Sequence, residues 1–212
     1  MVAIATLYNR IAGGSIERLA ALSDGLFAVA MTLLVLDLRA PAAETVHNER
    51  DLWQALVALS PRLLIYLMSF LTLGIFWVGQ QTQLNHLARA DRNLSWINLA
   101  FLFAVSLMPF STALMAEFIA YRVALLLYWA NILLLGVLLF ACWRYAARAS
   151  LVNPETPPEI GTGIERRIMI AQALYAFGAG LCAINTYWSI TFIMLVQLNY
   201  VIAPRIGPLF RL

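Results

Sequence analysis

The chain has 212 residues, of which 62% are hydrophobic and 12% are charged, and its mean hydropathy is +0.80. Soluble domains carry about 25% charged residues, so lipid rather than water must surround most of this chain. The net charge of +3 is too small and too scattered to indicate a nucleic-acid partner. Two histidines and two cysteines, none with ligand spacing, predict no metal site, no cofactor and no disulfide framework.

Long uncharged stretches predict six transmembrane helices, because a charge at the bilayer centre is costly. Three stretches reach the roughly 20 residues that one span needs. The uncharged run 168–204 is long enough for two spans, with a turn at Asn185-Thr186. The first candidate is more polar, since only 25–36 is free of charge. We expect a single all-α domain over 1–212, with spans at about 17–38, 62–84, 94–116, 122–143, 165–184 and 187–204.

Local signals suggest where these helices begin, bend and approach one another. Ser60, followed by a proline, is typical of a helix start, and the segment 162–165 matches a capping box. Pro109 predicts a kink within the third span. A short helix at 51–59 is expected in the polar connection before the second span, and the segment 178–180 (Gly-Ala-Gly) favours close helix packing.

The distribution of arginines predicts the orientation in the cell membrane. All fourteen basic residues are arginines, and cytoplasmic segments of membrane proteins are enriched in basic residues. With both termini in the cytoplasm, ten arginines lie inside and four outside. The inner set is Arg10, Arg18, Arg89, Arg92, Arg144, Arg148, Arg166, Arg167, Arg205 and Arg211, and the outer set is Arg39, Arg50, Arg62 and Arg122.

The first span carries the most informative motif, since an ionisable residue within a span indicates function. Residues 18–37 read RLAALSDGLFAVAMTLLVLD. This stretch resembles the first-helix signature of the prokaryotic branch of the transmembrane protein 175 family of potassium channels. A second block, from Gly74-Ile-Phe-Trp through Asn98 to Pro109-Phe-Ser-Thr, resembles the second and third helices of that family, so the likeness covers about 15–116. Leu22 replaces a phenylalanine of the family motif, and Gln80-Gln81 stands where a histidine is common.

The resemblance implies a homotetramer whose pore is lined by the first helix of each subunit and conducts K⁺ in preference to Na⁺. It places the apolar constriction at Val29, Leu33 and Leu36, with Thr32 beside them. It also implies a structural polar network in the matching positions. Its members are Arg18, Ser23, Asp24, Trp77, Gln81 and Asn98.

Helical geometry gives an independent view of the same residues. At about 100° per residue, Leu33 lies about 40° to one side of Val29 and Leu36 about 20° to the other. These side chains therefore form one stripe. Asp24 points about 140° away from the stripe, towards neighbouring helices rather than into a permeation path.

These observations favour a passive K⁺-preferring channel with a hydrophobic constriction, because the chain has no T-V-G-Y-G-like segment for a carbonyl filter. Four copies of Asp37 would concentrate cations at the outer mouth. A proton-coupled secondary transporter that uses Asp24 is the alternative, and it would show saturable, coupled flux without single-channel currents. A membrane enzyme has no nucleophile–base pair to support it, and an inert scaffold would show no flux.

Overall fold

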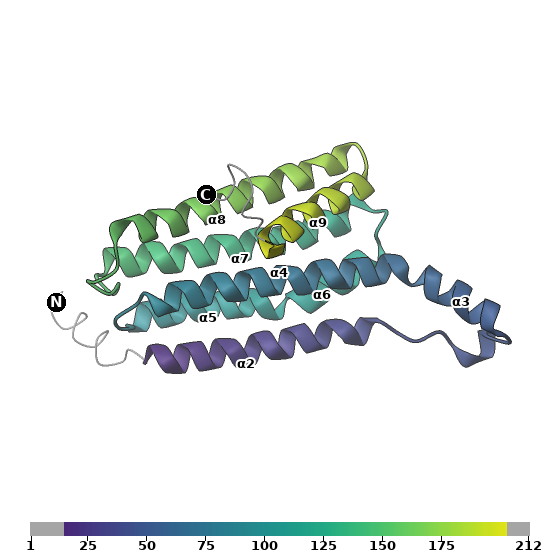
Figure 1. Cartoon of the computed structure of the whole chain (residues 1–212), viewed down its shortest axis with the longest axis horizontal. Helices are drawn as coiled ribbons and strands as arrows, with labels where there is room; N and C mark the ends of the chain where they lie inside the picture. Colours follow the sequence, from purple (N-terminus) through teal and green to yellow (C-terminus); the bar gives the residue numbers. More distant parts are fainter. Residues whose placement is uncertain (1–14, 203–212) are drawn as a thin grey trace.

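The computed structural model describes residues 15–202, and all its regular elements in that range are helices, which confirms the all-α prediction. Figure 1 shows α2, α4, the consecutive pair α5 and α6, α7 and α8 running side by side, while α3 projects beyond one end of the bundle. The α-helices are α2 (Ile16–Leu34), α3 (Glu49–Ala58), α4 (Ser60–Asn85), α5 (Arg92–Ser106), α6 (Met108–Glu117), α7 (Arg122–Arg148), α8 (Pro158–Gly180) and α9 (Thr186–Ile202). Short 3₁₀ turns are η1 (Val35–Asp37), η2 (Ala43–Thr45) and η3 (Leu181–Ala183).

Four helical segments in the described part of the chain are long and apolar enough to cross a membrane. They are Ile16–Asp37, Ser60–Asn85, Arg92–Glu117 and Arg122–Arg148. The helix α8 is not among the segments that could cross a membrane, because Glu165, Arg166 and Arg167 leave only 168–180 uncharged. The helix α9 has 17 residues, fewer than the roughly 20 of a full span. The six-span arrangement therefore stays a prediction.

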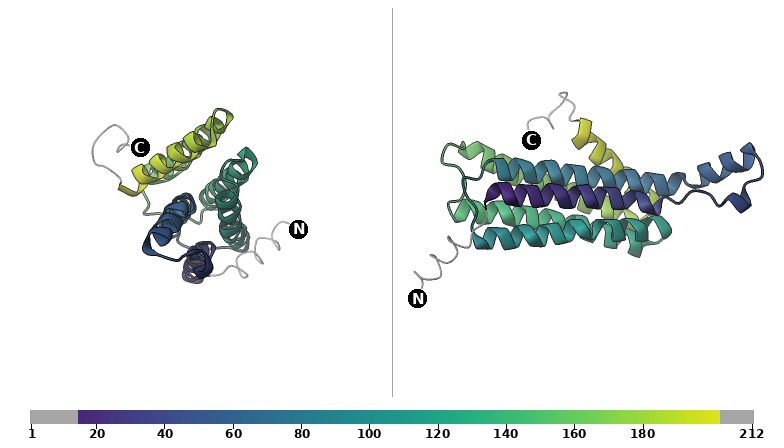
Figure 2. Two further views of the ribbon diagram at one scale, coloured as in Figure 1. Left: turned by 90° about the vertical axis from the view of Figure 1, so that its right-hand side faces the viewer. Right: turned by 90° about the horizontal axis from the view of Figure 1, so that it is seen from below.

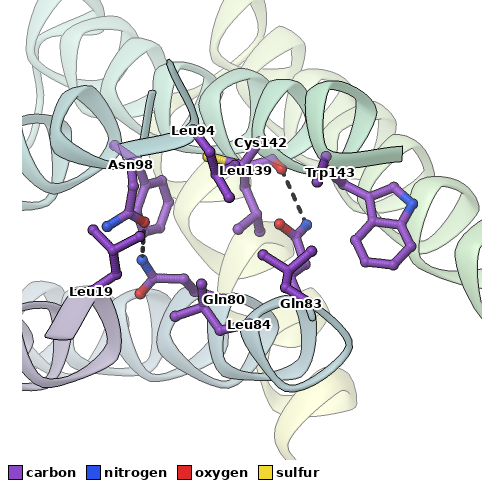
Figure 3. Close-up of a pocket in the computed structure, with 12 residues that line it drawn as sticks. Leu19, Gln80, Gln83, Leu84, Leu94, Asn98, Leu139, Cys142 and Trp143 are labelled. Carbon is purple, nitrogen blue, oxygen red and sulfur yellow. Dashed lines mark hydrogen bonds between the residues drawn. The ribbon is translucent and has the colours of Figure 1, made fainter. Parts of the chain in front are cut away.

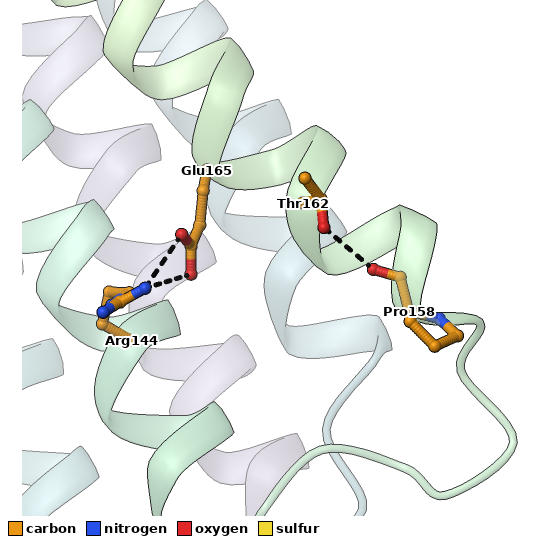
Figure 4. A network of polar contacts seen from close by, with 4 residues as sticks. All are labelled: Arg144, Pro158, Thr162 and Glu165. Atoms are coloured by element: carbon orange, nitrogen blue, oxygen red, sulfur yellow. Dashed lines mark hydrogen bonds and ion pairs between the residues drawn. The ribbon is translucent and has the colours of Figure 1, made fainter.

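Two predicted helix starts are wrong in detail. Ser60 is the first residue of α4 but makes no capping hydrogen bond, because Leu59 alone separates α4 from α3. Thr162 lies inside α8, which already begins at Pro158, and its Oγ1 donates to the Pro158 carbonyl oxygen at 3.3 Å (Figure 4). Glu165 is not part of a capping box either, because it forms an ion pair with Arg144 at 3.1 Å.

Three other local predictions are confirmed. The third membrane segment breaks at Leu107, which separates α5 from α6, and Pro109 lies in the first turn of α6. The short helix before α4 is present as α3. Gly178 allows α8 to approach α9 closely, since a Cβ atom there would lie 2.9 Å from side-chain atoms of Ile193 and Phe192.

The core forms where α2, α4, α5, α6, α7 and α9 meet. The helix α2 buries Leu19, Phe27, Ala30 and Leu34, which recur at helical spacing, and it packs on α4, α5 and α6. Figure 2 shows that α2 lies on one side of the bundle, whereas α8 and α9 lie on the opposite side. One long face of α2 is consequently left without a partner among the described residues.

Candidate pore helix and its polar supports

Within residues 15–202, no helix of the chain covers the predicted pore edge of α2. Val29 is 56% exposed, Leu33 is 43% exposed and Leu36 is 69% exposed. The opposite face of the same helix is buried against the bundle. Because three large apolar side chains share one open edge, that edge is free to meet lipid or a second copy of the chain.

The helix α2 changes geometry near its end. It begins after Ser15, whose Oγ accepts from the Arg18 backbone N–H at 3.1 Å, and its α-helical part ends at Leu34. The next three residues form the 3₁₀ turn η1, although a continuous α-helix to residue 38 was predicted. A 3₁₀ turn advances about 120° per residue, so Leu36 turns by a few tens of degrees relative to an α-helix and stays on the exposed edge.

Two polar residues accompany this edge. Thr32 is exposed, and its Oγ1 donates to the Val29 carbonyl oxygen at 2.8 Å. The hydroxyl hydrogen is thereby engaged, and the lone pairs of Oγ1 remain available on the exposed side. Asp37 ends the 3₁₀ turn half-buried, about 20 Å along the helix from Asp24.

Asp24 joins α2 to α4 at the rim of the exposed face. The Trp77 Nε1–H donates to Asp24 Oδ1 at 2.8 Å, and the Gln81 amide donates to the same oxygen. Both donors come from α4, four residues apart, so they lie on one face of that helix. Asp24 remains exposed in the single chain, while its two hydrogen bonds direct the carboxylate towards α4.

Ser23 belongs to a second, fully buried cluster. Its side chain is 0% exposed, and its Oγ accepts from Gln80 Nε2 at 3.0 Å. The same Gln80 nitrogen donates to Asn98 Oδ1 at 2.7 Å, so one amide links α2, α4 and α5. The predicted single network thus consists of two clusters, one around Asp24 and one around Gln80. Arg18 belongs to neither by any described contact and lies exposed near the start of α2.

Gln80 was missed as a site residue, since it was noted only, together with Gln81, as standing where a histidine is common in the family. Helical spacing indicates its position, since Leu73, Phe76 and Gln80 recur three and four residues apart and all are buried. Figure 3 shows Gln80 and Asn98 beside a small cavity of about 10 Å³. Gln80 Oε1 and Asn98 Nδ2 have no partner among the described residues. One acceptor and one donor match the needs of a single buried water.

A third buried polar cluster, also missed, lies deeper between α4, α6, α7 and α9. The Thr112 hydroxyl donates to Ser69 Oγ at 2.8 Å, and Ser69 Oγ donates to the Tyr128 hydroxyl at 3.2 Å. Gln197 Nε2 donates to Thr72 Oγ1 at 2.6 Å. Within lipid such groups need protein partners. This cluster therefore ties α4, α6, α7 and α9 together.

Comparisons with known proteins agree with this architecture. A family model described as "Endosomal/lysosomal potassium channel TMEM175" matches residues 18–109. A potassium channel of Streptomyces collinus is 32% identical over 79% of this chain and 82% of its own length. A potassium channel of Chamaesiphon minutus is 30% identical over 82% of this chain and 87% of its own. The crystal structure of a lysosomal potassium-selective channel TMEM175 homolog from Chamaesiphon minutus superposes with a TM-score of 0.78, at 27% identity over 90% of this chain and 98% of that one.

The fold and the first-helix motif together define a family of helical membrane channels, not of enzymes. The chain belongs to that family, TMEM175.

Proposed function

We propose that this protein is one subunit of a potassium-preferring cation channel of the cell membrane, with six spans and both termini in the cytoplasm. Its relatives in Streptomyces and Chamaesiphon are named potassium channels, and the superposed structure is that of a potassium-selective channel. The observation that carries the proposal is the open Val29–Leu33–Leu36 edge of α2.

The proposed assembly is a homotetramer around four α2 helices. Asp24 supports it, because this carboxylate is exposed on the single chain within a segment apolar enough to span a membrane. A charge facing hydrocarbon is strongly unfavourable. Packing of a neighbouring subunit against the α2–α4 rim would remove Asp24 from lipid and bring the apolar edges of α2 to a common axis.

In this arrangement the constriction works by excluding or admitting hydrated ions. A ring of Val29, Leu33 and Leu36 side chains offers no oxygen to replace water lost from an ion, so a narrow ring blocks. A slightly wider ring admits cations with their hydration shells. The Thr32 oxygens would face the same passage with free lone pairs, and four Asp37 carboxylates would raise the local cation concentration at the outer mouth.

Reconstitution into planar bilayers tests this function. With K⁺ on one side and Na⁺ on the other, we expect single-channel currents with a reversal potential that favours K⁺. Leu33→Ala and Leu36→Ala should each widen the constriction and increase the cation leak. Leu127→Ala, an exposed leucine on α7, is the matched control and should leave the leak unchanged.

Two results would contradict the proposal. Unchanged currents in both Leu33→Ala and Leu36→Ala would show that these leucines do not line the passage. Saturable, proton-coupled uptake without single-channel currents would support the transporter alternative, in which Asp24 carries the proton.

A further inference from the structure

A crevice of about 300 Å³ lies between α4, α7, α8 and α9. Because α8 and α9 lie on the side of the bundle opposite α2 (Figure 2), the crevice is on the face that a tetramer around α2 would turn towards lipid. Its volume is at the lower end of ligand-binding cavities, which span about 300–1,000 Å³. Apolar side chains form much of its wall, including Phe76, Leu139, Ile164, Ile168 and Ala171.

Arg167 is the charged residue of this crevice. Its guanidinium lies 5.6 Å from the centre of the Tyr200 ring, and both residues line the crevice. Every aspartate and glutamate of the chain falls within residues 15–202, and none of them pairs with Arg167 there. The neighbouring Glu165 already pairs with Arg144 at 3.1 Å. The crevice therefore presents a positive charge that no side-chain carboxylate of the described chain neutralises.

The position of Arg167 along α8 matches the polar–apolar boundary of a bilayer. The part of α8 before it contains Glu159, Glu165 and Arg166, whereas 168–180 is uncharged. The crevice wall follows α8 from Ile160 to Tyr175, and its part from Arg167 to Tyr175 covers about 12 Å along the helix axis. A ligand in this crevice would thus hold an anionic group at interface depth and extend into the hydrocarbon layer.

The inner part of the crevice is not purely apolar. The Tyr175 side chain is 1% exposed, and its hydroxyl has no hydrogen-bond partner among the described residues. Gln172 Oε1 is likewise buried without a partner there. Unpaired buried polar atoms are costly. A suitable occupant therefore has polar groups below its anionic group, and an ester carbonyl of a phospholipid can accept from the Tyr175 hydroxyl, whereas Gln172 Oε1, itself an acceptor, would need a donor.

We propose that this crevice binds one anionic phospholipid per subunit, with its phosphate at Arg167, its ester region near the Tyr175 hydroxyl, and an acyl chain along Ile168 and Ala171. The inference rests on the membrane location and on the proposed assembly around α2, but not on K⁺ conduction. The occupant would contact the same stretch of α4 that supports the pore helix. Gly79 and Gln83 line the crevice, whereas Gln80, between them, bonds to Ser23 of α2.

Native mass spectrometry of the full-length, detergent-solubilised protein tests the site. The protein is titrated with dioleoylphosphatidylglycerol, with zwitterionic dioleoylphosphatidylcholine and with inorganic phosphate. We expect one retained phosphatidylglycerol per subunit, weaker retention of phosphatidylcholine, and no effect of inorganic phosphate on the bound lipid. Arg167→Gln should weaken phosphatidylglycerol binding about fivefold. The matched control is Arg166→Gln, because Arg166 is on the same turn but does not line the crevice.

A second variant tests the crevice without altering charge. Gly163 lines the crevice, and a Cβ atom there would meet nothing within 4 Å, so Gly163→Leu fills space without a clash at its first carbon. It should reduce lipid retention while the oligomer mass and the melting temperature stay at wild-type values. If Arg166→Gln and Arg167→Gln weakened phosphatidylglycerol binding equally, the lipid would be held by diffuse attraction to a basic surface, and the crevice site would be overturned. Displacement of the lipid by inorganic phosphate, or equal retention of both lipids, would also overturn it.

Discussion

At the scale of single residues, the adjacent Ser23 and Asp24 have separate roles. They lie about 100° apart around α2, so Ser23 points into the buried cluster with Gln80, and Asp24 points to the rim with Trp77 and Gln81. The bonds of these two residues join α2 to different faces of α4. The rigid placement of α2 therefore depends on both residues.

Asp24→Ala should weaken the assembly more than the ion preference. The substitution leaves the Trp77 Nε1–H and the Gln81 amide without their acceptor, at a cost of about 1–3 kcal/mol. Size-exclusion chromatography with light scattering should show fewer tetramers and a lower melting temperature. Asp24→Asn retains an acceptor oxygen, so its tetramer fraction and melting temperature should lie between those of Asp24→Ala and wild type. A well-formed Asp24→Ala tetramer with altered K⁺ preference would instead assign Asp24 a direct role in permeation.

At the scale of elements, the contact between α8 and α9 depends on a single missing side chain. Ser189 Oγ of α9 donates to the Gly178 carbonyl oxygen at 2.6 Å, which requires the two helices to lie close together. Gly178 and Gly180 were predicted together as small packing residues, but a Cβ atom at Gly180 would meet nothing within 4 Å. Only the first of the two glycines is needed for the approach.

Gly178→Ala should lower the melting temperature, because overpacking costs about 1–3 kcal/mol. Gly180→Ala is the matched control in the last turn of the same helix, and it should keep or raise the melting temperature, because alanine favours the helix. Thermal unfolding in detergent, followed by circular dichroism, measures both. Equal destabilisation by the two substitutions would show that the α8–α9 distance adjusts freely to the added methyl group.

At the scale of the whole molecule, the open edge of α2 determines how copies can assemble. The side of the bundle opposite α2 contains α8 and α9, so an assembly around α2 would leave these helices at its periphery (Figure 2). The predicted pore depends on this placement. A contact between α2 helices of different subunits is its most direct consequence.

Oxidative cross-linking measures that contact. In a background without Cys142 and Cys182, Val29→Cys should give disulfide-linked dimers on a denaturing gel, because four copies would surround one axis. Phe177→Cys is the control, since Phe177 is 60% exposed on α8, at the periphery of the proposed assembly. Efficient cross-linking through Phe177→Cys and none through Val29→Cys would place α8 rather than α2 between the subunits.

The sequence by itself determined the membrane environment, the all-α class and the family, because uncharged run length and the motif around Ser23 and Asp24 are local properties. It also determined which residues share the α2 edge, since helical period alone orders them. The tertiary structure decided the rest. Helical period does not specify which neighbour faces a given side chain, so only the fold showed that Gln80, not Gln81, joins Ser23 to Asn98. The α2 edge is open for the same reason: burial depends on the packing of distant helices, and no other helix in the described part of the chain covers Val29 and Leu33.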